Sequence, residues 1–342
     1  MGRPVRLCCG YVVFKLSELC VRVIVSMEDE GHSFAPDTLT LMVNNDFRDT
    51  KTMDKVQSAA KAVSAIRDGM TIGIGGWGPR RKPMALIREL LRTDVKDLTV
   101  VAYGGADVGM LCAAGKVKKV IFAFVSLDFM PLEPGFRRAR ESGAIDVMEI
   151  DEGLMLLGLR AAAWGIPFIP TAVGLGTDVV THNPDIKLID SPYDEKAWLA
   201  MPALKLDVAL IQASHSDRRG VCSIESPDHY MDDWFARAAE HTIVACETVV
   251  ESDYFNDPST ARKVFWERAV TQSVVETPGG AHPSSNDPSY GFDSAHFGLY
   301  AKHIAEGTFE AYRAEFIGDS ESDYLDAVGG IDAIRTLPLP IY

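Results

Sequence analysis

The sequence predicts an α/β fold in which a mostly parallel sheet is covered by helices on both faces. Three observations carry this prediction. The chain has 342 residues, of which 47% are hydrophobic and 24% charged, as in ordinary globular proteins. From about residue 54, segments with strand patterns alternate with segments of helical periodicity. Residues 98–103 (LTVVAY) are apolar and rich in β-branched side chains, as buried parallel strands are.

The elements follow one another in a regular order. Apolar residues recur at helical spacing between residues 56 and 66, and Asp68-Gly69 predicts the end of that first helix. The predicted strands are residues 70–74, 98–103, 117–125, 144–150, 207–212 and 242–247. The other predicted helices are residues 84–91, 136–142, 152–164 and 231–241. Residues 171–200 predict a loop-rich excursion, and an acidic, aromatic, helical tail follows from about residue 285.

The charge balance narrows the classes of partner. Thirty-four Lys and Arg residues against 48 Asp and Glu residues give a formal net charge of −14. Nucleic acids and anionic membranes need a basic footprint, so neither is expected as a main partner. The six cysteines form no CxxC pair and no zinc-ligand spacing, which predicts reduced thiols, no metal site and a cytoplasmic protein.

The amino-terminal segment does not fit the regular pattern. Lys15, Glu18 and Arg22 interrupt its apolar run, which excludes a signal peptide and a membrane-spanning helix. We expect the segment to be a peripheral extension, or to precede a true translation start at Met53, and sequencing of the native amino terminus tests this. The expected division is residues 1–52 as this extension, residues 53–300 as the main domain and residues 301–342 as a helical tail.

A glycine-rich loop follows the first predicted strand of the domain. Residues 75–83 read GGWGPRRKP, and glycines there let the backbone turn sharply and bring N–H groups close to a ligand oxygen. Arg80, Arg81 and Lys82 make this the densest basic cluster of the domain. The loop is therefore a candidate cradle for an anion or oxyanion. The alternative is a tight turn with solvated arginines, since the spacing is neither a P-loop nor GxGxxG.

Three carboxylates, Glu149, Asp151 and Glu152, lie at a junction between a predicted strand and a helix. Acidic residues stabilise helix N-termini, so capping by Asp151 is one interpretation. A carboxylate at the carboxyl end of a strand is also placed for general acid–base catalysis. Two other candidates have similar alternatives. Ser126 follows an apolar strand and either lines a cleft or caps the strand, and His282 lies in a loop and is either functional or solvated.

These segments together resemble the α subunit of class I coenzyme A transferases, from about residue 53 to about residue 300. The G-G-x-G-x-x-x-x-P loop of that family is matched by Gly75, Gly76, Gly78 and Pro83, and its G-A-H-P-S run by residues 280–284. Glu152 is a departure, because the family's α subunits usually have glutamine there. The blocks GWGPRRKPM, TVVAYGG, CAAGKVKKV, IDEG and PGGAHP resemble a narrower subgroup, the α subunits of steroid ring-cleaving hydrolases.

This resemblance implies a substrate, a chemistry and a partner. The substrate would be a coenzyme A thioester bearing the last steroid ring as a cyclic β-keto group, opened by water. Glu152 would be the general base, and Gly75–Gly78 would hold the thioester or oxyanion. Residues implied in substrate or CoA binding are Gly75, Gly76, Trp77, Gly78, Arg80, Arg81, Tyr103, Ser126 and His282. The partner would be a transferase-type β subunit in an α2β2 heterotetramer, with no cofactor beyond the substrate's own coenzyme A.

Two other functions remain open from the sequence. A true CoA transferase would use a glutamate nucleophile in an S-E-N-G motif, which this chain lacks but which resides on the β subunit in that family. A non-catalytic ligand sensor would need a DNA-binding helix-turn-helix, and residues 1–50 contain no basic recognition helix.

Overall fold

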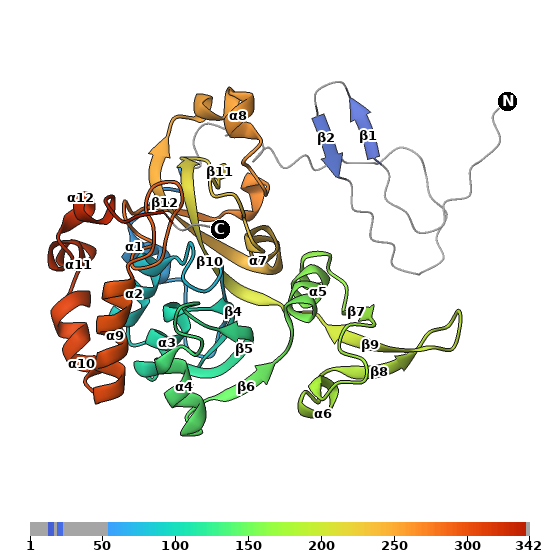
Figure 1. The fold of residues 1–342 in the computed structure, drawn as a ribbon. Coiled ribbons are helices and arrows are strands. Elements are labelled where there is room, and N and C mark those ends of the chain that lie inside the picture. The colour runs from blue at the N-terminus through green and yellow to red at the C-terminus, as the bar shows by residue number, and fades with distance from the viewer. Residues whose placement is uncertain (1–12, 17–18, 23–53, 340–342) are drawn as a thin grey trace. The chain divides into compact units, whose positions relative to one another are not determined.

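The computed structural model describes residues 54–339 and the backbone of two short strands, residues 13–16 and 19–22 (Figure 1). The chain divides into two compact units, residues 1–50 and 51–342. In the first unit, β1 (Val13–Leu16) pairs antiparallel with β2 (Leu19–Arg22). The rest of the predicted extension of residues 1–52 lies outside the described residues, and so does Met53, the predicted translation start. All remaining elements belong to the second unit.

Within the described residues, the second unit contains one eight-stranded sheet in the order β13-β12-β10-β3-β4-β5-β6, with β11 paired to β10. Every pairing along this path is parallel, and β11 alone in this sheet pairs antiparallel. The strands are β3 (Thr71–Ile74), β4 (Leu98–Gly104), β5 (Val117–Val125), β6 (Asp146–Glu149), β10 (Leu206–Asp217), β11 (Cys222–Ser223), β12 (Ala239–Val250) and β13 (Ser273–Glu276). The predicted parallel sheet is confirmed.

The order of strands reverses at the centre of the sheet. From β3 the chain builds outward through β4, β5 and β6, and then returns to place β10, β12 and β13 on the other side of β3. Gly75 donates its N–H to the carbonyl of Leu210, so the loop after β3 begins against β10. In open parallel sheets, ligands bind at such a reversal, beyond the carboxyl ends of the strands. The fold therefore directs attention to the glycine-rich loop.

Helices cover both faces, because right-handed crossovers running in opposite directions from β3 place their helices on opposite sides. Helices α1 to α4 pack against one another in sequence, whereas α5 packs against α7. The helices are α1 (Ala59–Val63), α2 (Met84–Arg92), α3 (Ala106–Ala113), α4 (Pro134–Glu141), α5 (Glu152–Ala163) and α7 (Asp232–Ala238). Among these, α3 was not predicted.

The predicted excursion at residues 171–200 contains a second, smaller sheet. Strands β7 (Phe168–Thr171), β9 (Ala197–Pro202) and β8 (Lys187–Asp190) pair antiparallel in that order, with the single-turn helix α6 (Val179–His182) between β7 and β8. Figure 1 shows this sheet beside α5 and apart from the central strands. It was expected as loops, because β7 and β8 are short and mostly exposed, although β9 buries Leu199 and Met201.

The tail wraps the domain. Helix α9 (Ser294–Glu306) packs on α4, and α11 (Glu321–Ala327) packs on α2. The aromatic residues that made the tail distinctive in the sequence are its buried contacts, among them Phe297, Tyr300, Tyr312 and Tyr324. The remaining short helices are η2 (Ser252–Asn256), α8 (Pro258–Ala261), η3 (Arg268–Val270), α10 (Phe309–Tyr312), η4 (Arg313–Ile317) and α12 (Gly330–Ile334).

The cysteines and the helix lengths bear on two expectations from the sequence. Cys112, Cys222 and Cys246 are free thiols in the interior of the described part of the chain. In that same part, every helix is too short or too polar to cross a bilayer.

Candidate active site

The glycine-rich loop is shaped by contacts that leave no room for side chains. Gly76 has φ +75° and a Cβ there would overlap the carbonyl oxygens of Arg80 and Arg81. A Cβ on Gly75 would approach the Asp232 carboxylate to 2.6 Å. Glycine is therefore required at both positions, for the backbone conformation at one and for the close approach at both.

The N–H groups of this loop are bonded inside the chain, which differs from our expectation that they hold a thioester oxygen. The four bonds are Gly75 to the Leu210 carbonyl (2.9 Å), Gly76 to the Asp232 carboxylate (2.7 Å), Trp77 to the Arg80 carbonyl (2.9 Å) and Gly78 to the Tyr103 carbonyl (3.2 Å). A backbone N–H that already has a good acceptor is a poor donor to a ligand. The glycine-rich loop consequently gives the site a fixed backbone shape and does not supply free N–H donors at these four residues.

Arg81 lies in the interior, where we had expected a ligand-binding side chain. Its guanidinium is 1% exposed and pairs with the fully buried carboxylate of Asp232 at 2.6 Å. It also donates to the carbonyl of Asp228 at 3.1 Å. These contacts join the glycine-rich loop to the turn before α7. We therefore assign Arg81 to holding the site together, and we do not carry it forward as a group that binds carboxylate or phosphate.

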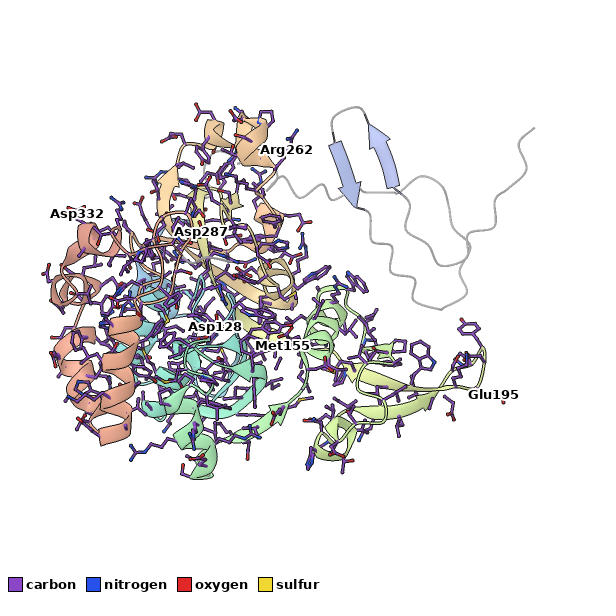
Figure 2. All side chains as sticks on the ribbon, viewed as in Figure 1. Asp128, Met155, Glu195, Arg262, Asp287 and Asp332 are labelled. Carbon is purple, nitrogen blue, oxygen red and sulfur yellow. The ribbon has the colours of Figure 1, made fainter. Side chains whose placement is uncertain are left out.

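Lys82 makes a second buried clamp. Its ammonium lies 3.2 Å from the carboxylate of Asp107 and donates to the carbonyl of Tyr103 at 2.7 Å. Burial lowers the pKa of Lys82, and the Asp107 charge opposes that shift. Of the three cations in the sequence cluster, two are thus internal. Arg80 is the more accessible one and forms an ion pair with Asp128 (labelled in Figure 2).

Three aromatic rings form a stack beside this loop. The Trp77 ring lies between Tyr103, with centroids 4.8 Å apart, and Tyr230, with centroids 5.7 Å apart, and both interplanar angles are 19°. The Phe124 ring packs edge-to-face with Trp77, with ring centroids 4.8 Å apart. Trp77 and Tyr103 were candidates from the sequence. Tyr230 was missed, since it lies just before α7, far from them in the chain.

Glu152 begins α5 next to this stack. The Tyr103 hydroxyl donates to the Glu152 carbonyl at 2.9 Å. Asp151 caps the helix, accepting the N–H of Leu154 at 2.8 Å, so the capping interpretation holds for Asp151 and leaves the Glu152 carboxylate available for other work. That carboxylate is exposed. Partial burial, together with the negative charge of Asp151, raises the pKa of Glu152.

Ser126 and His282 occupy different surroundings. Ser126 lies in the turn after β5, where its hydroxyl accepts the N–H of Asp128 at 3.0 Å and its carbonyl approaches Gly78. His282 is 1% exposed, and its ring nitrogens contact the Tyr324 hydroxyl at 2.6 Å and the Asp293 carboxylate at 3.2 Å. Burial lowers the pKa of His282. Its ring is therefore neither solvated nor part of the aromatic stack.

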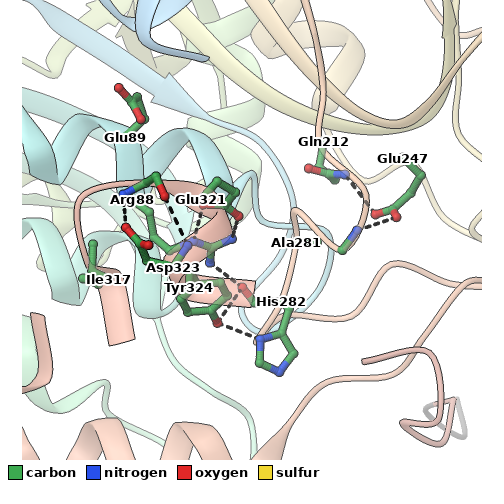
Figure 3. A network of polar contacts seen from close by, with 12 residues as sticks. Arg88, Glu89, Gln212, Glu247, Ala281, His282, Ile317, Glu321, Asp323 and Tyr324 are labelled. Carbon is green, nitrogen blue, oxygen red and sulfur yellow. Dashed lines mark hydrogen bonds and ion pairs between the residues drawn. The ribbon is translucent and has the colours of Figure 1, made fainter. Parts of the chain in front are cut away.

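A polar network anchors this histidine to the tail (Figure 3). Arg88 of α2 donates to the His282 carbonyl at 2.6 Å and pairs with Glu321 of α11. The same guanidinium lies over the ring of Tyr324, 3.5 Å from its centroid. The chain then runs directly to the site, because Ser285 accepts the Arg81 N–H at 2.7 Å. His282 thus anchors the segment that runs to Ser285, and Ser285 in turn bonds the glycine-rich loop.

Backbone strain gathers at the same place. In the described part of the chain, the non-glycine residues with positive φ are Arg81, Asp97, Asp128, Glu195 and Tyr230. Arg81, Asp128 and Tyr230 all border the Trp77 loop. Such conformations cost about 1–3 kcal/mol each and persist where the surrounding structure enforces them, which is frequent at functional sites.

A surface pocket opens on the outer side of the aromatic stack. Its volume is about 620 Å³, and its lining residues are Trp77, Arg80, Pro227, Asp228, Tyr230 and Met231. This size falls within the range of about 300–1,000 Å³ that is typical of small-molecule sites. The described residues contain no cluster of three or more His, Cys, Asp or Glu side chains suited to a metal ion.

Comparisons with known proteins agree with this architecture. The family model for coenzyme A transferase matches residues 56–262. The cholesterol ring-cleaving hydrolase IpdA subunit of Rhodococcus jostii is 43% identical over 287 residues, which cover 80% of this chain and 96% of the relative. The subunit of the same name from Mycobacterium tuberculosis is 40% identical over 294 residues, covering 82% and 99%. The resemblance stated from the motifs is confirmed.

Solved structures extend the comparison to the fold. Glutaconate coenzyme A-transferase from Acidaminococcus fermentans superposes with a TM-score of 0.78 and 27% identity, covering 84% of this chain and 96% of the other. The decarboxylase AibA/AibB gives a TM-score of 0.68 and 27% identity, covering 76% and 97%. The sheet and its helices are therefore those of transferase subunits. By sequence and by fold, the chain belongs to the coenzyme A transferase family.

Proposed function

We propose that this chain is the α subunit of a heteromeric acyl-CoA hydrolase that opens the last ring in steroid catabolism. Two relatives that carry the name of a cholesterol ring-cleaving hydrolase subunit are similar over nearly their whole length. The observation that carries the proposal in the structure is Glu152. Glu152 begins α5 at the carboxyl edge of the sheet, its backbone carbonyl accepts from Tyr103 of the aromatic stack, and its carboxylate is not consumed by helix capping.

The reaction follows from the chemistry of a cyclic β-keto thioester. Water adds to the ring ketone, and the bond between that carbon and the carbon next to the thioester breaks. The electron pair passes to the thioester-bearing fragment as an enolate, which then takes up a proton. The former ketone becomes a carboxylic acid, and the thioester stays intact, so no CoA is released. One water is consumed for each ring opened.

Glu152 would act as the general base that takes the proton from water. An ordinary glutamate with a pKa of about 4.3 is ionised but weakly basic at neutral pH. Partial desolvation and the Asp151 charge raise the pKa of Glu152 above its ordinary value, which makes the carboxylate a stronger base. The Tyr103 hydroxyl, bonded to the Glu152 carbonyl, fixes the first turn of α5 in which this carboxylate lies.

A partner subunit completes this proposal. Glu152 is exposed in the isolated chain, and the loop N–H groups expected to stabilise an enolate are already bonded within the chain. Charge stabilisation at the enolate oxygen then falls to other donors. We assign them to a transferase-type β subunit that covers this edge in an α2β2 assembly. Because its substrate is a CoA thioester, we place the enzyme in the cytoplasm.

The test is co-expression with such a β subunit, followed by incubation of the purified complex with a cyclic β-keto acyl-CoA. We expect one water to be incorporated into a ring-opened acyl-CoA, measured by mass spectrometry in ¹⁸O-labelled water, with no free CoA. Replacement of Glu152 by Gln should retain substrate binding and lower turnover by about 10²–10⁴-fold. Near-normal turnover in that variant would remove Glu152 from this role.

The same experiment addresses CoA transfer. A true transferase would move CoA to an added carboxylic acid and leave the ring closed. It would also accumulate a glutamyl thioester on the partner, which borohydride traps. Either result would replace the hydrolase proposal.

A further inference from the structure

The pocket beside Trp77 has the composition of a site for an uncharged ring system. Four of its lining residues present largely apolar surface, namely Trp77, Pro227, Tyr230 and Met231. We propose that this pocket holds the cyclic part of the acyl group, and that Trp77 and Tyr230 set a preference for cyclic over linear acyl chains. The inference rests on the proposed function and deepens it by locating the acyl end of the substrate.

The charge of the pocket argues against the nucleotide end of coenzyme A. That end carries several phosphate charges, which need a net positive surface. Arg80 is the cation of the lining and is paired with Asp128, and Asp228 adds a negative charge of its own. The pocket therefore offers phosphates no net attraction. An aliphatic ring loses unfavourable contact with water when it enters the same space.

Two contacts connect the pocket to the first turn of α5, which begins at the proposed base. Trp77, which forms its inner wall, stacks on Tyr103 with ring centroids 4.8 Å apart. The Tyr103 hydroxyl donates in turn to the backbone of Glu152. One aromatic ring and one hydrogen bond thus connect the pocket to the residue that would activate water. The end of the substrate that fits here is the end that reacts.

The outer wall is held in place before any ligand binds. Tyr230 has φ +51°, and its N–H is bonded to the Asp228 carboxylate at 2.6 Å. The buried Arg81 guanidinium lies 5.1 Å from the centroid of the Tyr230 ring and also bonds the Asp228 carbonyl. A preformed wall suits a rigid ring, because a flexible linear chain must lose conformational entropy to lie against it.

Tyr230 offers a clean variant, since glycine accepts a positive φ without strain. Replacement of Tyr230 by Gly removes the ring and should leave the turn folded. Trp77→Ala is the second variant, Tyr230→Phe is the matched control that keeps the ring, and Tyr193→Ala removes an aromatic side chain that is 96% exposed on the small sheet. Folding and assembly with the β subunit are checked by circular dichroism and size-exclusion chromatography.

Binding is measured by calorimetry with two unreactive probes, a cyclic acyl-CoA without the β-keto group and a linear acyl-CoA of equal carbon number. We expect the Kd of the cyclic probe to rise about tenfold in Tyr230→Gly and Trp77→Ala, as for loss of one aromatic contact. The Kd of the linear probe should change by less than about twofold. Tyr193→Ala should bind the two probes as the original protein does, and Tyr230→Phe should still favour the cyclic probe because it keeps the ring.

Two results would overturn the inference: equal weakening of both probes, or unchanged binding of the cyclic probe in both variants. Because the probes are unreactive, this outcome does not depend on turnover. If the unmodified complex fails to open a cyclic β-keto acyl-CoA, the proposed function fails by itself. If it opens the ring and the Kd of the cyclic probe is unchanged in Trp77→Ala and Tyr230→Gly, the pocket assignment alone fails.

Discussion

Asp232 and Arg81 form a fully buried ion pair that joins the two loops bordering the candidate site. One carboxylate oxygen of Asp232 accepts from the Arg81 guanidinium at 2.6 Å, and the other accepts the Gly76 N–H at 2.7 Å. Both side chains are at most 1% exposed. The pair therefore fixes the glycine-rich loop against the start of α7, and the shape of the site depends on it.

Loss of this pair should destabilise the protein strongly. Replacement of Asp232 by Asn leaves the Arg81 charge buried without a counter-ion, which typically costs about 3–5 kcal/mol. Urea unfolding measures the change. The exposed pair between Arg218 and Asp54 supplies the control, because Arg218→Ala should cost less than about 1 kcal/mol. Equal small losses in both variants would show that Asp232 is not needed to neutralise Arg81.

Glycine is needed at position 76 for two reasons, the positive φ and the lack of space for a Cβ, and the stability cost of each can be measured separately. Gly76 and Gly69 have nearly the same φ, +75° and +77°, but a Cβ on Gly69 would have nothing within 4 Å. Replacing Gly69 by Ala should therefore cost about 1–2 kcal/mol from the backbone alone. Replacing Gly76 by Ala should cost about 1–3 kcal/mol more, because the methyl group overlaps two carbonyls. Similar unfolding free energies for the two variants would contradict this.

The pH dependence of turnover should report the environment of Glu152. The negative charge of Asp151 helps to raise the pKa of Glu152. Asp151→Asn removes that charge and keeps a side chain that caps helices well. The pKa of Glu152 should fall, so the acidic limb of the pH–rate profile should move to lower pH. Asp146→Asn, an exposed change at the other end of β6, is the control, and an unmoved limb in Asp151→Asn would mean that another group titrates.

The buried carboxyl of Glu133, which caps α4, should make stability fall as pH rises. Burial raises the pKa of Glu133 to about 7, with hydrogen bonds from Tyr300 and the Phe136 N–H opposing the shift. The unfolded chain loses this proton near pH 4.5, whereas the folded protein keeps it until about 7. Stability is therefore lost across that interval, by roughly 3 kcal/mol in total.

Replacement of Glu133 by Gln keeps the group neutral at every pH and should remove this loss. Denaturation at a series of pH values from 4 to 8 compares the two proteins, and Glu141→Gln at the exposed end of the same helix is the control. The curves of the original protein and Glu133→Gln should separate as pH rises. Parallel curves would show that folding leaves the pKa of Glu133 unchanged.

Much of the fold was accessible from the sequence, because buried parallel strands are apolar runs. The strands β3, β4, β5, β10 and β12 follow such runs, and the helices between them follow patterns with one apolar face. Helix α3 was missed for a physical reason. Its residues from Ala106 to Cys112 are all buried, so the segment lacks the polar face that produces a helical period. Tyr230 was missed because no spacing relates it to Trp77.

The sequence singled out the glycine-rich loop but could not show its internal hydrogen bonds and ion pairs. Arg80 and Arg81 are neighbours of identical chemistry, yet the first reaches the surface and the second is enclosed. The carboxylate that decides this, Asp232, lies 151 positions away in the chain. Sequence spacing cannot show a pairing over that separation. The same holds for His282, whose neighbours come from the tail.

The order of strands has a consequence for synthesis of the protein. The central strand β3 leaves the ribosome early, but its neighbour β10 follows only after β4, β5, β6 and the small sheet. Tyr324, which is buried in the core, lies in α11, near the end of the chain. The nascent chain must therefore hold an open apolar edge beside β3 until β10 has been made. We expect it to need chaperone protection until release, and we expect premature stops within the last helices to yield insoluble fragments in place of shortened enzyme.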